Sequence, residues 1–237
     1  MRVRAGAVVC AVVASVPLVT GCGSDDSVVS AADATPTVTA TPSAGASLSR
    51  ERAQRQALVQ SAKIDWSKAA ETATGEVPQS ELVELDLGRT PREASPSGTD
   101  GTASPSPAPT PGSPQWTATV ALRDGTAHIV TIDAVTGEVR QSRAEQGQDT
   151  DDKRELAGLL SRATRTPQQA VDAATKKFPG TVTGLQLSED DGDDDTSTTG
   201  PTVVWETEVA DTDEWTEADI EVDAVTGNVL RERIDQD

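Results

Sequence analysis

Five residues, Asp133-Ala-Val-Thr-Gly137, return unchanged later in the chain as Asp223-Ala-Val-Thr-Gly227. Three further pairs of segments recur upstream in the same order: residues 116–121 and 205–210, residues 84–87 and 184–187, and residues 58–78 and 159–179. A series of similar segments in one fixed order is typical of a structural unit that occurs twice. The sequence therefore predicts two copies of one small fold.

Each copy is predicted to be a helix followed by antiparallel strands, which is an α+β unit. Thr166 and Pro167 combine a capping side chain with a proline that suits the first helical position. Apolar residues alternate along residues 83–87, as they do in a half-buried strand. Asp133 can accept backbone N–H groups and Gly137 can adopt a positive φ, so the repeated segment predicts a tight turn before a closing strand.

The two segments Ile132-Asp-Ala-Val-Thr-Gly-Glu-Val139 and Val222-Asp-Ala-Val-Thr-Gly-Asn-Val229, each preceded by a helix and a Trp-x-x-x-Val strand, resemble the PepSY domain. The resemblance covers about residues 50–143 and 152–235. It implies a non-catalytic protein that inhibits, chaperones or docks on a peptidase or another envelope protein. It brings no catalytic residue and no cofactor. Because no peptidase accompanies these domains, the target is expected to be a separate protein.

The first residues predict export. Arg2 and Arg4 precede an apolar segment, residues 5–19, which is too short for an ordinary membrane span and suits a secretory signal. The following Val-Thr-Gly-Cys22 resembles the lipobox of bacterial lipoproteins. That resemblance implies cleavage before Cys22 and lipid on its thiol. We therefore expect the protein to be anchored on the outer face of the bacterial cytoplasmic membrane.

Composition divides the remaining chain. Residues 1–21 are the expected signal peptide, and residues 22–47 are too poor in large apolar residues to fold, so they are expected to be a disordered tether. PepSY-like repeat 1 is placed at residues 48–143 and repeat 2 at residues 144–237. Within repeat 1, residues 88–115 hold seven prolines and are expected to be a disordered insert.

Charge and residue types exclude several functions. The formal net charge of −19 becomes −21 when the two arginines of residues 1–21 are removed, which argues against nucleic acid as a partner. The single histidine, His128, excludes a His-Glu-x-x-His zinc site, and no phosphate-binding glycine loop is present. A hydrolase is the weakest alternative, and His128 is expected at the edge of the core.

The two copies differ in charge on one predicted strand face. Residues 48–143 have a net charge of −2 and residues 144–237 a net charge of −16. The candidate partner-binding residues of the second copy are Glu206, Glu208, Trp215, Glu217, Asp219 and Glu221. The first copy has at the equivalent outward positions Thr117, Thr119, Gly125, Ala127, Ile129 and Thr131.

In a hairpin, Glu206 and Glu208 are expected to face Asp219 and Glu217. Three interpretations remain open for this face: docking of a basic partner protein, weak binding of a divalent cation such as calcium, and solubility alone. The acidic run at residues 189–195 does not have the spacing of an EF-hand loop and is expected to be a solvated loop.

Overall fold

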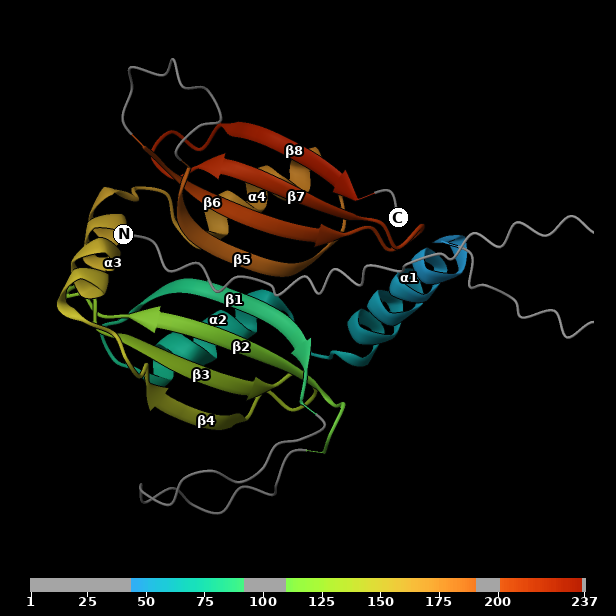
Figure 1. Cartoon of the computed structure of the whole chain (residues 1–237), viewed down its shortest axis with the longest axis horizontal. Helices are drawn as coiled ribbons and strands as arrows, with labels where there is room; N and C mark the ends of the chain where they lie inside the picture. Colours follow the sequence, from blue (N-terminus) through green and yellow to red (C-terminus); the bar gives the residue numbers. More distant parts are fainter. Residues whose placement is uncertain (1–43, 92–109, 191–200, 236–237) are drawn as a thin grey trace, which may run out of the picture. The chain divides into compact units, whose positions relative to one another are not determined.

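The computed structural model describes residues 44–91, 110–190 and 201–235, which form four helices and one antiparallel sheet of eight strands (Figure 1). The strands follow the order β4-β3-β2-β1-β5-β6-β7-β8 across the sheet. The α+β class is confirmed. The elements are α1 (Ala44–Ser61), α2 (Trp66–Glu76), β1 (Glu81–Arg89), β2 (Pro114–Ala121), β3 (Ala127–Asp133), β4 (Val139–Ala144), α3 (Thr150–Arg162), α4 (Pro167–Lys177), β5 (Thr181–Asp190), β6 (Thr202–Ala210), β7 (Glu217–Asp223) and β8 (Val229–Asp235).

The core lies between one face of the sheet and the helices α2 and α4. α2 packs against β1 to β3, and α4 packs against β5 to β7. Alternate strand residues supply the sheet side of this core, as Trp116, Ala118 and Val120 do in β2. Ala69 and Ala73 of α2 are fully buried, and their small side chains allow the helix to lie close to the strands. The opposite face of the sheet faces the viewer in Figure 1.

Each half of the chain contains two helices followed by four strands, where the sequence predicted one helix. In each half, an N-cap residue lies between the two helices and starts the second one. Asp65 accepts the Lys68 N–H at 2.9 Å at the start of α2. Thr166 caps α4 and is followed by Pro167 at the first position, as expected from the sequence.

The repeated sequence segments hold the connection between the two helices of each half. In the first half, the N–H groups of Lys63 and Ile64 donate to the Ala134 carbonyl at 2.7 and 3.1 Å, and the indole of Trp116 donates to the Ile64 carbonyl at 3.2 Å. The second half makes the equivalent bonds between Thr164 or Arg165 and Ala224, and between Trp205 and Arg165. The repeated tryptophan and turn are therefore structural.

The tight turn predicted after the third strand of each half is confirmed. The Asp133 carboxylate accepts the N–H groups of Val135 and Thr136, both at 2.8 Å. Gly137 and Gly227 have φ angles of 79° and 81°. An L-residue with a Cβ is strained in this region, which explains why glycine ends both copies of the segment.

The two halves join through β1 and β5, a pairing that the sequence did not predict. Three residue pairs form this antiparallel ladder: Glu84 with Gln186, Leu85 with Leu185, and Asp86 with Gly184. Leu85 and Leu185 are 1% and 2% exposed, so the junction continues the core from one half into the other. We call this ladder the β1–β5 seam.

Some predicted boundaries differ from the structure. α1 begins at Ala44, inside the segment expected to be a tether. β1 continues to Arg89 and β2 begins at Pro114, so both ends of the expected insert at residues 88–115 are strands. Residues 92–109 and Cys22 lie outside the described residues. Within the described ranges, no helix combines the length and apolar character that crossing a membrane requires.

Candidate functional site

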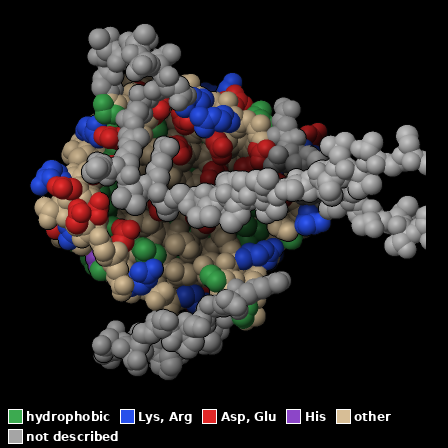
Figure 2. Space-filling model, in the orientation of Figure 1, with side chains coloured by type: hydrophobic (Ala, Val, Ile, Leu, Met, Phe, Trp, Pro, Cys, Tyr) green, Lys and Arg blue, Asp and Glu red, His purple; other side chains and the backbone are tan. Residues whose placement is uncertain are grey.

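Five of the six candidate residues lie on two neighbouring strands. Glu206 and Glu208 extend from β6, while Glu217, Asp219 and Glu221 extend from β7. Figure 2 shows Asp and Glu side chains gathered over the part of this face where β5 to β8 lie. The structure therefore brings these carboxylates together.

The pairing between them differs from the prediction by two residues. Glu206 faces Glu221 and Glu208 faces Asp219, while Glu217 faces Ala210 at the end of the ladder. The turn between β6 and β7 causes the shift. The Asp211 N–H donates to the Thr216 carbonyl at 2.9 Å and closes a six-residue turn, so pairing begins at Glu217.

Trp215 lies in that turn and not on the strand face, which corrects the prediction. Its φ of 59° is in the left-handed region, so the alternation of strand side chains stops before it. The Trp215 side chain is half-buried, and the backbone carbonyl of Trp215 accepts a hydrogen bond from the Arg55 guanidinium at 2.7 Å.

Ala127 of the first half was also expected to face outward. It is 1% exposed because residues 145–148 pass beside it, where Gln148 accepts its N–H at 3.1 Å.

Two carboxylates that the sequence did not single out complete the cluster. Glu84 and Asp86 lie on β1, and the β1–β5 seam aligns them with the second half. One row across the sheet is Asp86, Gly184, Glu208 and Asp219, and the next is Glu84, Gln186, Glu206 and Glu221. We call the set Glu84, Asp86, Glu206, Glu208, Glu217, Asp219 and Glu221 the acidic face.

Gly184 shapes the centre of the acidic face. The Glu208 carboxylate lies over this glycine, and a Cβ at residue 184 would collide with it. The surrounding residues of β1, β5, β6 and β7, together with Arg233 of β8, line a hollow of about 200 Å³. A side chain at residue 184 would fill part of that hollow, so the glycine keeps it open.

Crowding raises the pKa of three of these carboxyl groups. Partial burial, together with the charges of Glu217 and Asp86, raises the pKa of Glu208 to about 7. Partial burial and the charge of Glu84 raise the pKa of Asp86. Partial burial and the charge of Glu217 raise the pKa of Asp219. The face therefore holds its full negative charge only at a cost.

Cations of the protein itself contact only part of the acidic face. Arg55 of α1 pairs with Glu217 at 2.7 Å. Arg231 and Arg233 of β8 pair with Glu221 at 3.0 and 3.6 Å, and Glu221, which was expected to face outward, is 7% exposed. Arg233 also faces Asp219. Ser188 and Thr119 donate hydroxyl groups to Glu206 and Glu84. Across the described ranges, no ion pair within 4.0 Å is formed by Asp86 or Glu208. These two carboxyl groups lie in the hollow, and their raised pKa values mean that a cation placed beside them would favour their charged forms.

No group of three or more His, Cys, Asp or Glu side chains suited to a metal ion occurs among the residues that the structure describes. Of the acidic run at residues 189–195, only Glu189 and Asp190 are described, at the end of β5. Glu189 pairs with Arg162. His128 is half-buried on β3.

Comparison with known proteins gives one family. The profile described as the peptidase propeptide and YPEB domain, PepSY, matches residues 166–233. No curated protein matches the chain. Among solved structures, the crystal structure of a protein described as a lipoprotein from Clostridium difficile 630 is similar to this chain. The two share 22% sequence identity over 73% of this chain and 95% of the other, with a TM-score of 0.38. The YpmB protein from Bacillus subtilis has 14% identity over 72% of this chain and 98% of its own, with a TM-score of 0.24. The family match covers α4, the strands β5 to β7 and most of β8, so this chain contains a PepSY domain at residues 166–233.

Proposed function

We propose that the chain is a lipid-anchored lipoprotein that docks on a basic partner in the cell envelope through its acidic face, and that it catalyses no reaction. The lipobox-like segment ending at Cys22 supports the anchor and the extracytoplasmic location. The PepSY domain supports a partner of the peptidase or envelope-enzyme type. The partner is a separate protein in this proposal, and docking modulates or positions it.

The observation that carries the proposal is a cluster of carboxylates that the fold does not need. Glu206 and Glu208 occupy the positions where the first half has Thr117 and Thr119 in the same kind of strand. Like charges facing each other across a sheet are unfavourable by roughly 0.2–1 kcal/mol per pair. The repulsion among these carboxylates destabilises the fold, and a cationic partner would offset it. The carboxylates would also increase the rate at which such a partner associates.

Residues 48–143 are, in the same proposal, a second PepSY-like unit. Their support is the order of helices and strands, the repeated turn and the bonds from the helix connection to Ala134 and Trp116. These features match those of the half that contains the PepSY domain. This unit lacks the acidic surface on β2 and β3, so we assign it a structural role in extending the sheet.

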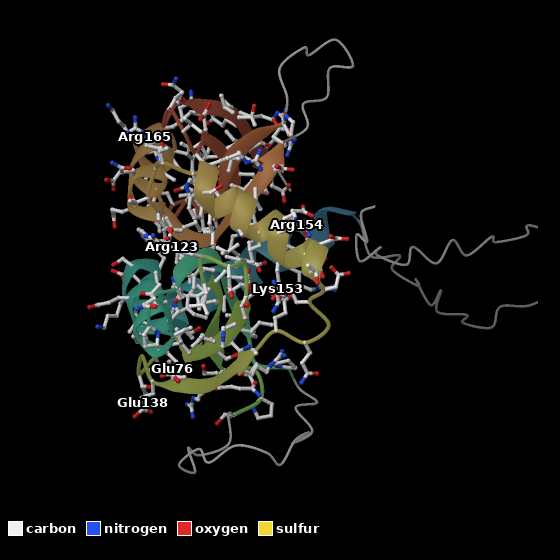
Figure 3. The ribbon with its side chains drawn as sticks, turned by 90° about the vertical axis from the view of Figure 1, so that its left-hand side faces the viewer. Glu76, Arg123, Glu138, Lys153, Arg154 and Arg165 are labelled. Carbon is white, nitrogen blue, oxygen red and sulfur yellow. The ribbon has the colours of Figure 1, made fainter. Side chains whose placement is uncertain are left out.

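Crosslinking in intact cells tests the docking function. The variant Glu206→Gln with Glu208→Gln keeps side-chain size and removes two central charges. The matched control, Glu76→Gln with Glu138→Gln, removes two charges at the end of the first half that is distant from the second half (Figure 3). The expected result is one set of envelope proteins captured by the wild type and the control and lost by the acidic-face variant. Equal capture by all three proteins would contradict the proposal.

A calcium titration separates docking from the cation alternative. Cation binding predicts that millimolar calcium raises the thermal midpoint of the wild type well above that in sodium chloride of matched ionic strength. Docking predicts equal midpoints in the two salts. A calcium effect that disappears in the acidic-face variant would replace the proposed function with cation binding.

A further inference from the structure

The helix α1 reaches the acidic face from outside it. The Arg55 side chain, 14% exposed, pairs with Glu217 Oε2 at 2.7 Å and donates to the Trp215 carbonyl at 2.7 Å. Arg55 thus connects the N-terminal helix to the turn between β6 and β7. Glu217 is central in the electrostatics of the face, because its charge acts on Asp86, Glu208 and Asp219.

The packing of α1 is shallow apart from this contact. Among its described side chains, from Arg50 onward, none is fully buried, and Leu58 and Val59 only reach the edge of the core. The Nε atom of Arg52 is buried and has no hydrogen-bond partner among the described residues. Segments with few buried apolar contacts open at a lower free energy than the core of the same protein, and α1 has the features of such a segment.

α3 lies against the equivalent turn of the first half and is held differently. A Cβ at Gly125, in the turn between β2 and β3, would collide with the Lys153 backbone of α3. Gln148, just before α3, donates to the Gly125 carbonyl at 2.7 Å. Leu159 of α3 is 7% exposed. Close backbone contact and burial therefore hold α3, and α1 and α3 lie at opposite ends of the sheet in Figure 1.

The turn that α1 contacts is also strained. Trp215 has a φ of 59°, which is unfavourable for a residue with a Cβ, whereas the equivalent Gly125 has a φ of 83° at no such cost. The Arg55 hydrogen bond to the Trp215 carbonyl supports this conformation. Loss of Arg55 from the turn would permit the strain to relax, which favours release of the helix.

We propose that α1 competes in cis for the acidic face: Arg55 occupies Glu217, and a partner that places an arginine or lysine there displaces the helix. The inference rests on the proposed docking function and adds its regulation. α1 begins within the last residues of the segment predicted to link the domain to the membrane. Docking of a partner would therefore lengthen that link by one helix.

Hydrogen exchange on the free protein tests the attachment of α1. Arg55→Gln should make the amides of α1 exchange roughly tenfold faster while the strands keep their protection. Arg50→Gln removes the same charge from an exposed position of the same helix and should leave the exchange of α1 near the wild-type rate. Arg55→Lys keeps the charge and loses the forked guanidinium, so it should give an intermediate rate.

Binding of a defined probe tests the competition. The probe is a labelled peptide of alternating arginine and serine, with a glutamine-for-arginine peptide as its control. Arg55→Gln should lower the Kd of the arginine peptide at least about threefold relative to Arg50→Gln, because the competitor is removed while the net charge is equal. Addition of the arginine peptide to the wild type should also speed exchange in α1.

The outcomes separate the two proposals. Unchanged α1 exchange in Arg55→Gln would overturn the release of the helix. Faster exchange with an unchanged Kd would overturn the competition alone. If the arginine peptide binds neither the wild type nor Arg55→Gln, the docking function and the competition both fail, whereas release of α1 is still decided by the exchange of the free protein.

Discussion

The two halves of the sheet have the same construction, but the outer surface of the second half is acidic and that of the first half is nearly neutral. In both, a tryptophan and an Asp-Ala-Val-Thr-Gly turn hold the connection between two helices. On the outer face, Thr117 and Thr119 of β2 occupy the places that Glu206 and Glu208 occupy in β6. The difference teaches that the residues shared by the halves serve the fold, and that a specific function is to be sought among the residues that differ.

The largest expected effect on stability comes from single substitutions at the equivalent positions of the two hairpin turns, Gly125 and Trp215. Gly125→Ala should lower the free energy of unfolding by more than about 2 kcal/mol, because the new Cβ is strained at positive φ and collides with the Lys153 backbone. Trp215→Gly should change it by less than about 1 kcal/mol, since relief of strain offsets lost contacts. Chemical denaturation followed by circular dichroism measures both. Equal losses would show that the two turns are packed alike.

A smaller, pH-dependent effect is expected at Glu208, where the first half has Thr119. The folded protein holds a proton on Glu208 up to about pH 7, whereas the unfolded chain loses it near the ordinary pKa of 4.5. The resulting stabilisation is complete below about pH 4.5 and is lost as the pH rises through about 7. Glu208→Gln keeps a neutral group at every pH, so it should raise stability at pH 8 and not at pH 4.

Solvent screening limits the size of this gain, because part of the Glu208 side chain is exposed. We expect up to about 1 kcal/mol at pH 8, measured by urea titration at a series of pH values. Glu138→Gln on the first half is the control and should show no such pH dependence. A gain that is the same at pH 4 and pH 8 would mean that the charge of Glu208 is not the cause.

The smallest effect is expected from shortening the connection between β1 and β2. Deletion of residues 92–109 should change the free energy of unfolding by less than about 0.5 kcal/mol. The ends are already close, because the Thr90 N–H donates to the Ser113 carbonyl at 2.8 Å and the Gly112 N–H donates to the Thr90 carbonyl at 3.0 Å. The equivalent connection of the second half is shorter. Differential scanning calorimetry of the deletion variant measures the effect. A broad, non-cooperative unfolding transition would show that the deleted segment contributes to the fold.

Local features of the fold were predictable because short segments determine them. The caps at Thr166 and Pro167, the positive φ of Gly137 and Gly227, and the buried alternation of β2 follow from residue chemistry alone. The β1–β5 seam was not predictable, since no local pattern tells which strand edges will pair. For the same reason Glu84 and Asp86 were missed. The sequence did contain one signal for them, because Glu84 and Asp86 alternate with the apolar residues of a predicted strand and therefore share its outer face.

Trp215 was misplaced because left-handed backbone is usually signalled by glycine. The glycine was present at the equivalent position of the other half, as Gly125, and the comparison of copies could have identified the turn. The predicted pairing between β6 and β7 was wrong for the same reason, because the turn between them was placed incorrectly. Arg55 was missed for a different reason: its contact with Glu217 joins residues far apart in the sequence, and no periodicity reveals it.

The seam has a further consequence, for aggregation. Two separate four-stranded sheets would expose four edges of unpaired backbone, and such edges pair readily with other chains. Joining β1 to β5 leaves only β4 and β8 at the margins. Both carry arginines, such as Arg143 and Arg233, as edge strands commonly carry charge to prevent unwanted pairing. A fragment limited to the PepSY domain would instead present β5, which contains Leu185 of the seam, as an open edge, and it should pair with another copy of itself.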